Sequence, residues 1–135
     1  MEAKANSYML LFRSGASERE MSPEQLQEFT NKWMAWVDRL KEAGKFVDGE
    51  PLTPEGRVVS GEGGGIKVSD GPFTESREAI GGFFVLDVAS FEEATAIARD
   101  CPNLVHGGAV EVRQIADCCP NVKAAREAQE AVASA

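Results

Sequence analysis

Histidine, tyrosine and cysteine are scarce in this sequence, with one, one and three residues among 135. A single histidine and the lack of a Cys-x-x-Cys spacing argue against a zinc site. The cysteines are odd in number and the polar N-terminus shows no secretory pattern, so we expect reduced thiols in a cytoplasmic protein. The longest apolar run, at 79–86, is far shorter than the roughly 20 residues that span a bilayer, so we expect no membrane partner.

Basic residues are fewer than acidic residues. Fourteen Lys and Arg stand against 22 Asp and Glu, which gives a net charge of −8. Nucleic acids need a basic surface, so we expect no nucleic-acid partner. The sequence has no Walker or Gly-x-Ser-x-Gly motif, and the glycines at 61–65 precede a strand pattern rather than the helix of a phosphate loop. We therefore expect no metal and no organic cofactor.

The remaining pattern is that of one globular domain with strands and helices in alternation. Ser22 and Gln25 form a capping box, and Gly44 is placed to end the helix that follows it. The pattern predicts, in chain order, a strand at 8–12, a helix at 22–44, a strand at 45–48, a hairpin with arms at 57–60 and 66–69, a strand at 79–88, a helix that begins at 90 and ends at 101–103, a strand at 110–115 and a helical tail at 121–133.

This order predicts an α+β domain with the β-α-β-β-α-β arrangement of a ferredoxin-like fold. The hairpin is an insertion, the core covers about 7–115, and 116–135 form a C-terminal helical tail of the single domain. Apolar spacing predicts a buried stripe from Leu26 to Leu40 on the first helix and another that begins at Phe91 on the second.

Two of the predicted strands, at 8–12 and 79–88, are apolar on both faces. Two helices cover only one face of such a sheet, and the alanine-rich tail has few large side chains with which to cover the other. A second copy packed sheet to sheet is the better cover, so we predict a homodimer. Glu111 and Arg113 share one face of the last strand, and they would line a polar pocket if that face points into the dimer.

Residues 68–75, VSDGPFTE, followed by GGFF at 81–84, resemble the signature of the DGPF branch of the YCII-related family. The similarity extends over about 8–115 and implies a ferredoxin-like subunit in a dimeric α+β barrel. Members of the wider superfamily are treated as small-molecule enzymes with a His–Asp pair, and some relatives are associated with sigma factors. That pair does not carry over, because its positions fall on Trp33 and near Ser14.

The candidate catalytic residues are His106, Asp70 and Glu75. His106 is the one imidazole in the chain and lies beside two glycines that allow close approach of a ligand, although it could equally be a loop residue bonded to backbone. Asp70 and Glu75 could supply a carboxylate base or orient the imidazole, and Thr74 could contact a polar ligand. The same three residues could also simply fix the turn in which they lie.

The candidate substrate-binding residues are Arg13, Arg113, Thr74 and Trp33. Either arginine could hold an anion, although Arg13 could equally pair with a surface acid. Trp33 lies on an apolar helix face, where it is either core or a stacking surface for a ligand. These residues support two hypotheses. The first is an enzyme with lyase, isomerase or hydrolase-like acid–base chemistry on a small molecule, and the alternative is a non-catalytic module that binds a metabolite or a regulatory protein of transcription.

Overall fold

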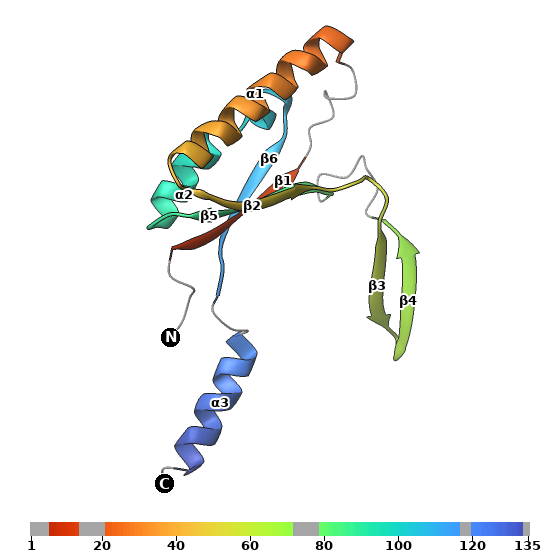
Figure 1. Ribbon diagram of the computed structural model, residues 1–135. Helices are drawn as coiled ribbons and strands as arrows, with labels where there is room; N and C mark the ends of the chain where they lie inside the picture. Colours follow the sequence, from red (N-terminus) through yellow and green to blue (C-terminus); the bar gives the residue numbers. More distant parts are fainter. Residues whose placement is uncertain (1–5, 14–20, 72–78, 117–119, 134–135) are drawn as a thin grey trace.

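The computed structural model of the chain describes residues 6–13, 21–71, 79–116 and 120–133. Its elements are β1 (Ser7–Arg13), α1 (Pro23–Glu42), β2 (Phe46–Pro51), β3 (Arg57–Glu62), β4 (Gly65–Asp70), β5 (Ile80–Asp87), α2 (Phe91–Ala98), the 3-10 helix η2 (Pro102–His106), β6 (Ala109–Gln114) and α3 (Pro120–Ala133) (Figure 1). Four strands form an antiparallel sheet in the order β2-β5-β1-β6, and β3 pairs with β4. The predicted ferredoxin-like α+β fold with an inserted hairpin is therefore confirmed.

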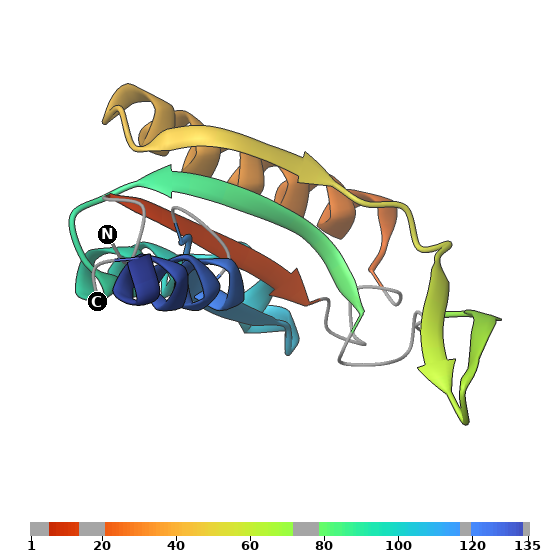
Figure 2. The ribbon, with the colours of Figure 1, turned by 90° about the horizontal axis from the view of Figure 1, so that it is seen from below.

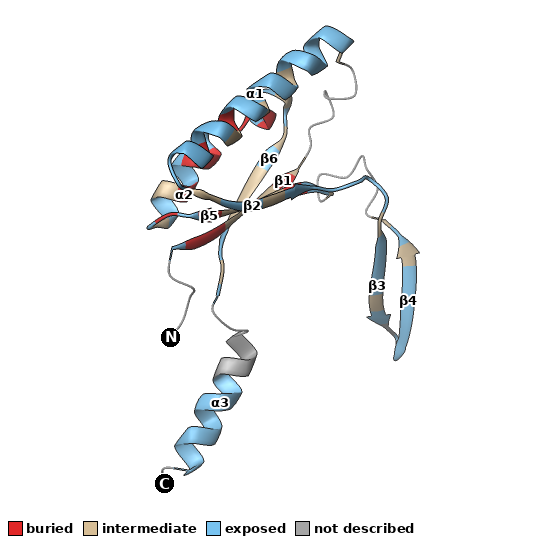
Figure 3. Cartoon of the chain, viewed as in Figure 1, coloured by how far each residue is buried: buried red, intermediate tan, exposed pale blue. Residues whose placement is uncertain are grey.

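Helices α1 and α2 cover one face of the four-stranded sheet (Figures 1 and 2). Tyr8, Leu10 and Phe12 of β1 are buried on this face and form the core with side chains that include Trp36 and Leu40 of α1. Burial is concentrated in this layer (Figure 3). Because side chains alternate along a strand, the intervening residues of β1 point to the opposite face, which we call the open face.

The open face has an apolar centre. Met9 lies opposite Val85, and Leu11 lies opposite Phe83, in the register of β1 and β5. All four side chains are only partly buried. Helix α3 stands away from the sheet, and its side chains at 124–133 are exposed (Figures 1 and 3). The helices of the described residues therefore leave this apolar centre without a cover.

Helix α1 begins as the sequence predicts. The Ser22 hydroxyl accepts a hydrogen bond from the Gln25 N–H at 3.1 Å, and the Gln25 side chain accepts one from the Ser22 N–H at 2.9 Å. The predicted buried stripe is wrong at Leu26, which is exposed. The 20 residues of α1 rise about 30 Å. The seven residues of β1 span about 23 Å, so the first turns of α1 extend beyond the sheet.

Helix α2 begins at its predicted cap, and its Ala94, Ile97 and Ala98 are buried in the core. The Glu93 carboxylate in its first turn accepts a hydrogen bond from the Ala89 N–H at 3.1 Å and pairs with Lys45 at 3.1 Å. These contacts lower the pKa of Glu93, because both favour its charged form. The prediction that Phe91 is buried is wrong. As the first residue of the helix its ring is exposed and meets Tyr8 edge to face, with centroids 5.1 Å apart.

The β3–β4 hairpin projects beyond the end of β2 (Figures 1 and 2). Its turn is Gly63–Gly64, with φ of 59° and 84°, the positive values that a two-residue hairpin turn requires and that glycine adopts readily. At the base, Arg57 pairs with Asp70 at 3.4 Å, and the Gly71 N–H donates to the Gly56 carbonyl at 3.3 Å. The two strands are therefore tied together where they leave the body of the protein.

His106 ends the 3-10 helix η2, whereas the sequence predicted an open loop. Pro102 begins η2 because its fixed φ suits a first helical position, and Gly107 ends it with a φ of 80°. Gly108 follows at a close approach of two backbones, since a Cβ there would lie 2.7 Å from the carbonyl oxygen of Arg13. The turn after His106 is thus packed against the end of β1.

The two glycines after η2 should respond differently to the same substitution. Gly107→Asn introduces a residue that tolerates positive φ at a site with no atom within 4 Å of the new Cβ, so we expect a loss of unfolding free energy below about 1 kcal/mol. Gly108→Asn drives a Cβ into the Arg13 carbonyl, so we expect a loss of about 1–3 kcal/mol. Urea unfolding measures both losses, and equal values would contradict the close packing at Gly108.

Candidate functional site

The strands that carry or follow the predicted site residues meet at one end of the sheet, which we call the site end. Arg13 at the end of β1 lies opposite Ile80, the first residue of β5, and opposite Ala109, the first residue of β6. The segment that begins at Asp70 leads into β5, and η2 with His106 leads into β6. The topology therefore brings segments that are far apart in the sequence to one place.

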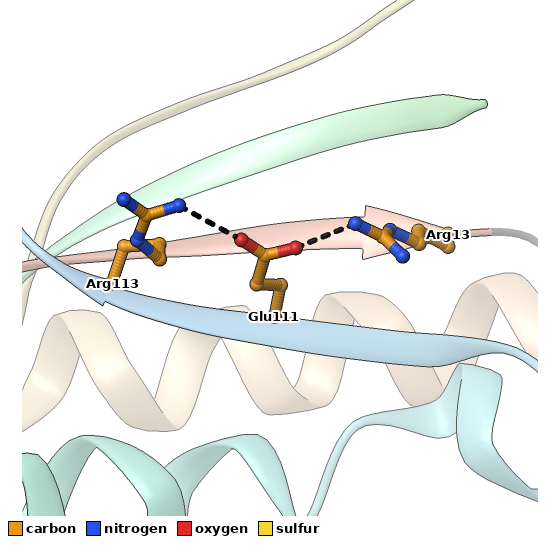
Figure 4. A network of polar contacts seen from close by, with 3 residues as sticks. All are labelled: Arg13, Glu111 and Arg113. Carbon is orange, nitrogen blue, oxygen red and sulfur yellow. Dashed lines mark hydrogen bonds and ion pairs between the residues drawn. The ribbon is translucent and has the colours of Figure 1, made fainter. Parts of the chain in front are cut away.

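An arginine–glutamate cluster of Arg13, Glu111 and Arg113 lies on the open face. Arg13 Nη2 donates to Glu111 Oε1 at 2.5 Å, and Arg113 Nη1 donates to Glu111 Oε2 at 3.1 Å (Figure 4). The side chains of Arg13 and Glu111 are 35% and 33% exposed, and that of Arg113 is 68% exposed. Two guanidinium groups share one carboxylate, so the cluster has one net positive charge in a chain of net charge −8.

The cluster borders the apolar centre of the open face. Glu111 lies opposite Leu11, and Arg113 lies opposite Met9, in the register of β1 and β6. The Nε of Arg13 is buried and has no hydrogen-bond acceptor in the part of the chain that the structure describes. A buried donor without an acceptor costs about 1–3 kcal/mol. A ligand that offers an acceptor to the Arg13 Nε–H would therefore remove this cost.

Glu111 is the member of the cluster that the sequence did not place among the candidate site residues. The alternation of 110–115 already placed Glu111 and Arg113 on one face of the last strand. The contact with Arg13 joins residues 98 positions apart, and it depends on the register of β1 and β6. Of the two alternatives for Arg13, the structure shows pairing with an acid, and that acid lies on the open face.

His106 lies on the helix side of the sheet. Its ring meets that of Phe29 in α1 edge to face, with centroids 5.1 Å apart and an interplanar angle of 87°. The side chain is partly buried. The structure thus places His106 and Arg13 at the same end of the sheet but on opposite faces.

Asp70 ends β4 in the projecting hairpin. Its carboxylate pairs with Arg57, and its side chain is 87% exposed. Asp70 thus contacts Arg57 within the hairpin, whereas His106 contacts Phe29 of α1. Thr74 and Glu75 lie outside the described residues, so their predicted roles stay predictions.

Trp33 belongs to an aromatic group between α1 and the sheet. Its ring meets those of Phe12, Trp36 and Phe84 with centroids 5.0, 5.3 and 5.9 Å apart. These edge-to-face contacts are the geometry that aromatic rings prefer in a protein core. Of the two alternatives for Trp33, the structure shows packing between helix and sheet.

Two kinds of feature are absent from residues 6–13, 21–71, 79–116 and 120–133. No group of three His, Cys, Asp or Glu side chains is placed to hold a metal ion. No helix among them is both long and apolar enough to cross a membrane.

The fold and the cluster define a class: a small α+β protein with a ferredoxin-like sheet and a charged cluster on its uncovered face. The chain belongs to the YCII-related family, since the model of the YCII-related domain matches residues 7–119. It is also similar to the uncharacterized protein R00369 of Rhizobium meliloti (strain 1021), with 37% identity over 81 residues. That match covers 53% of this chain and 65% of the relative, so it spans just under two thirds of the relative's length.

The imidazole of His106 should report its contact with Phe29 in proton NMR. Phe29→Leu removes the neighbouring aromatic ring, so we expect a change of ring current that moves the His106 Hε1 signal. A single histidine makes that signal unambiguous. Phe91→Leu is the matched control, because its ring meets Tyr8 instead and the signal should stay in place. An equal response to both substitutions would refute the position of His106.

Proposed function

We propose that this protein is a homodimer that binds a small carboxylate at the arginine–glutamate cluster, between two sheets packed face to face. The observation that carries the proposal is a cluster with net positive charge at the border of a partly buried apolar face.

The homodimer is supported by the apolar centre of the open face. Met9, Leu11, Phe83 and Val85 form adjacent pairs there, and the described helices do not cover them. A contiguous apolar surface of this kind is typical of an interface. Sheets pack face to face at about 10 Å, with interdigitated side chains, so a second copy of the same face is a suitable cover. Such packing would form the dimeric α+β barrel that the family resemblance implies.

The carboxylate is supported by the charge of the cluster. Packing of a second sheet would remove water from Arg13 and Glu111, which are already two-thirds buried. One net positive charge per subunit would then lack a counter-ion, at a cost of several kcal/mol. A planar guanidinium binds a carboxylate through two parallel hydrogen bonds, which would offset this cost. The neighbouring Leu11 and Met9 favour a ligand with an apolar part.

A catalytic function is the second candidate. The turn after His106 packs against the carbonyl of Arg13, so the imidazole and Arg13 share the site end of the sheet. A ligand that extends past this end would meet His106 as acid or base, with Asp70 or Glu75 as a second carboxylate and Thr74 as a polar contact. Such chemistry would be of the lyase, isomerase or hydrolase type. A non-catalytic role in metabolite binding or in the regulation of transcription is the alternative.

We further assign the chain to the DGPF branch of the YCII-related family. The string DGPF at 70–73 and the string GGF at 81–83 support this assignment. We also propose a cytoplasmic location, which the odd number of cysteines supports.

Leu11→Asp should convert the dimer into a folded monomer, because it places a charge at the apolar centre of the open face. Sedimentation velocity measures the assembly, and circular dichroism checks the fold. Val105→Asp is the control, since Val105 is exposed on η2 and the variant should stay dimeric. Met9→Lys is a second disruptive variant whose long stem can lie along the sheet if Leu11→Asp fails to fold. A monomeric wild-type protein, or two dimeric open-face variants, would overturn the homodimer.

Substitutions within the cluster should change carboxylate affinity in opposite directions. Arg13→Gln removes a charged donor, whose hydrogen bonds contribute about 1.5–3 kcal/mol, so we expect affinity to fall by about tenfold or more. Glu111→Gln removes the carboxylate that competes with the ligand, so affinity should rise. Calorimetry with benzoate and succinate measures both changes.

Controls for the carboxylate experiment come from the chain and from the probe. Arg57→Gln alters an arginine–carboxylate pair outside the cluster and should leave affinity unchanged. Benzamide, which lacks the charge of benzoate, should not bind. A carboxylate that shifts the Arg13 Nε–Hε signal alone supports binding without catalysis, whereas a shift of the His106 ring as well supports the catalytic candidate. Absence of binding, or equal effects of R13Q and E111Q, would overturn the proposed ligand.

A further inference from the structure

We infer that the β3–β4 hairpin is an arm that packs on a second copy of this chain, through the face that carries Val59, Ile66 and Val68. The inference rests on the homodimer of the proposed function and adds a second contact to it. Val59 lies opposite Val68, and Ile66 lies opposite Gly61, in the register of the two strands. Side chains at these alternate positions share one face of the hairpin, which we call the apolar arm face.

The apolar arm face has no partner among the described residues of its own chain. Ile66 is 78% exposed, and Val59 and Val68 are exposed as well. Strands β3 and β4 form their own two-stranded sheet, apart from the main sheet. A two-stranded hairpin alone is at best marginally stable in water. Burial of this face against another surface would supply the stabilisation that the hairpin lacks.

The position of the hairpin favours a second copy as its partner. The hairpin and α3 extend from the sheet on the side of the open face, and they lie toward opposite ends of it (Figures 1 and 2). A second sheet packed on the open face would lie between them. The Arg57–Asp70 ion pair closes the base of the hairpin, which holds the arm together where it projects.

The neutral charge of the arm is also compatible with a second copy as its partner. Within 57–70, Arg57 and Lys67 balance Glu62 and Asp70, so the arm is neutral in a chain of net charge −8. Two bodies that carry this negative charge repel each other. A neutral arm adds apolar contact without adding to this repulsion. It also carries no net charge that would attract a strongly basic or acidic partner.

The experiment compares Ile66→Asp with Val58→Asp in the full chain. Gly61 lies opposite Ile66, so I66D breaks no side-chain pair within the hairpin. Val58 is 41% exposed and lies on the other face of the hairpin, which makes V58D the matched control. Sedimentation equilibrium should show a dimer Kd raised by about tenfold or more for I66D, as for an anchor residue of an interface. For V58D it should show a change within about twofold, as for an ordinary surface residue.

Each outcome supports or contradicts the inferred contact of the arm with a second copy. A larger loss of dimer in I66D than in V58D supports it, and Ile66→Thr, which keeps strand propensity, should show the same direction if I66D disturbs the hairpin. Equal effects of I66D and V58D overturn it. If Leu11→Asp dissociates the dimer and Ile66→Asp does not, the inferred contact of the arm is wrong. The proposed homodimer is then still supported. A monomeric wild-type protein would overturn both.

Discussion

The structure depends on a mismatch between its sheet and its helices. Strands β1 and β5 carry large apolar side chains on both faces, while α1 and α2 cover one face only. On the covered face, Leu10 and Leu86 are fully buried, whereas Leu11 and Val85 on the open face keep part of their surface in water. Burial contributes about 25 cal/mol for each Å² of apolar surface, so a free open face is a persistent drive toward association.

The charged groups of the open face would lie inside the interface that such an association would form. The arginine–glutamate cluster lies at the border of the apolar centre, where any surface that covers Leu11 also reduces the hydration of Glu111. Lower hydration strengthens every electrostatic interaction of the cluster. The net charge of −8 repels an anion at long range, so the proposed selectivity for a carboxylate would depend on short-range hydrogen bonds from Arg13 and Arg113.

The sequence predicts the elements whose signals are local. The capping box at Ser22 and the glycine-rich turn expected at 61–65 each depend on a few neighbouring residues. The capping box forms as expected, and the turn is shorter than expected, at Gly63–Gly64. Burial is less predictable, because periodicity assigns Leu26 to a face without showing that the sheet ends before it. The pairing of Glu111 with Arg13 required the register of two strands that lie far apart in the chain, and no local pattern fixes that register.

The same sheet separates Arg13 of the arginine–glutamate cluster from His106. Arg13 and His106 lie at one end of the sheet, but the first belongs to the open face and the second packs against α1. Hydrogen-bonded strands leave no passage through the sheet, so a molecule held by Arg13 meets the imidazole only around the site end, past Ile80 and Ala109. A short carboxylate would therefore stay on the open face. Acid–base chemistry at His106 requires a ligand long enough to extend beyond the ends of three strands.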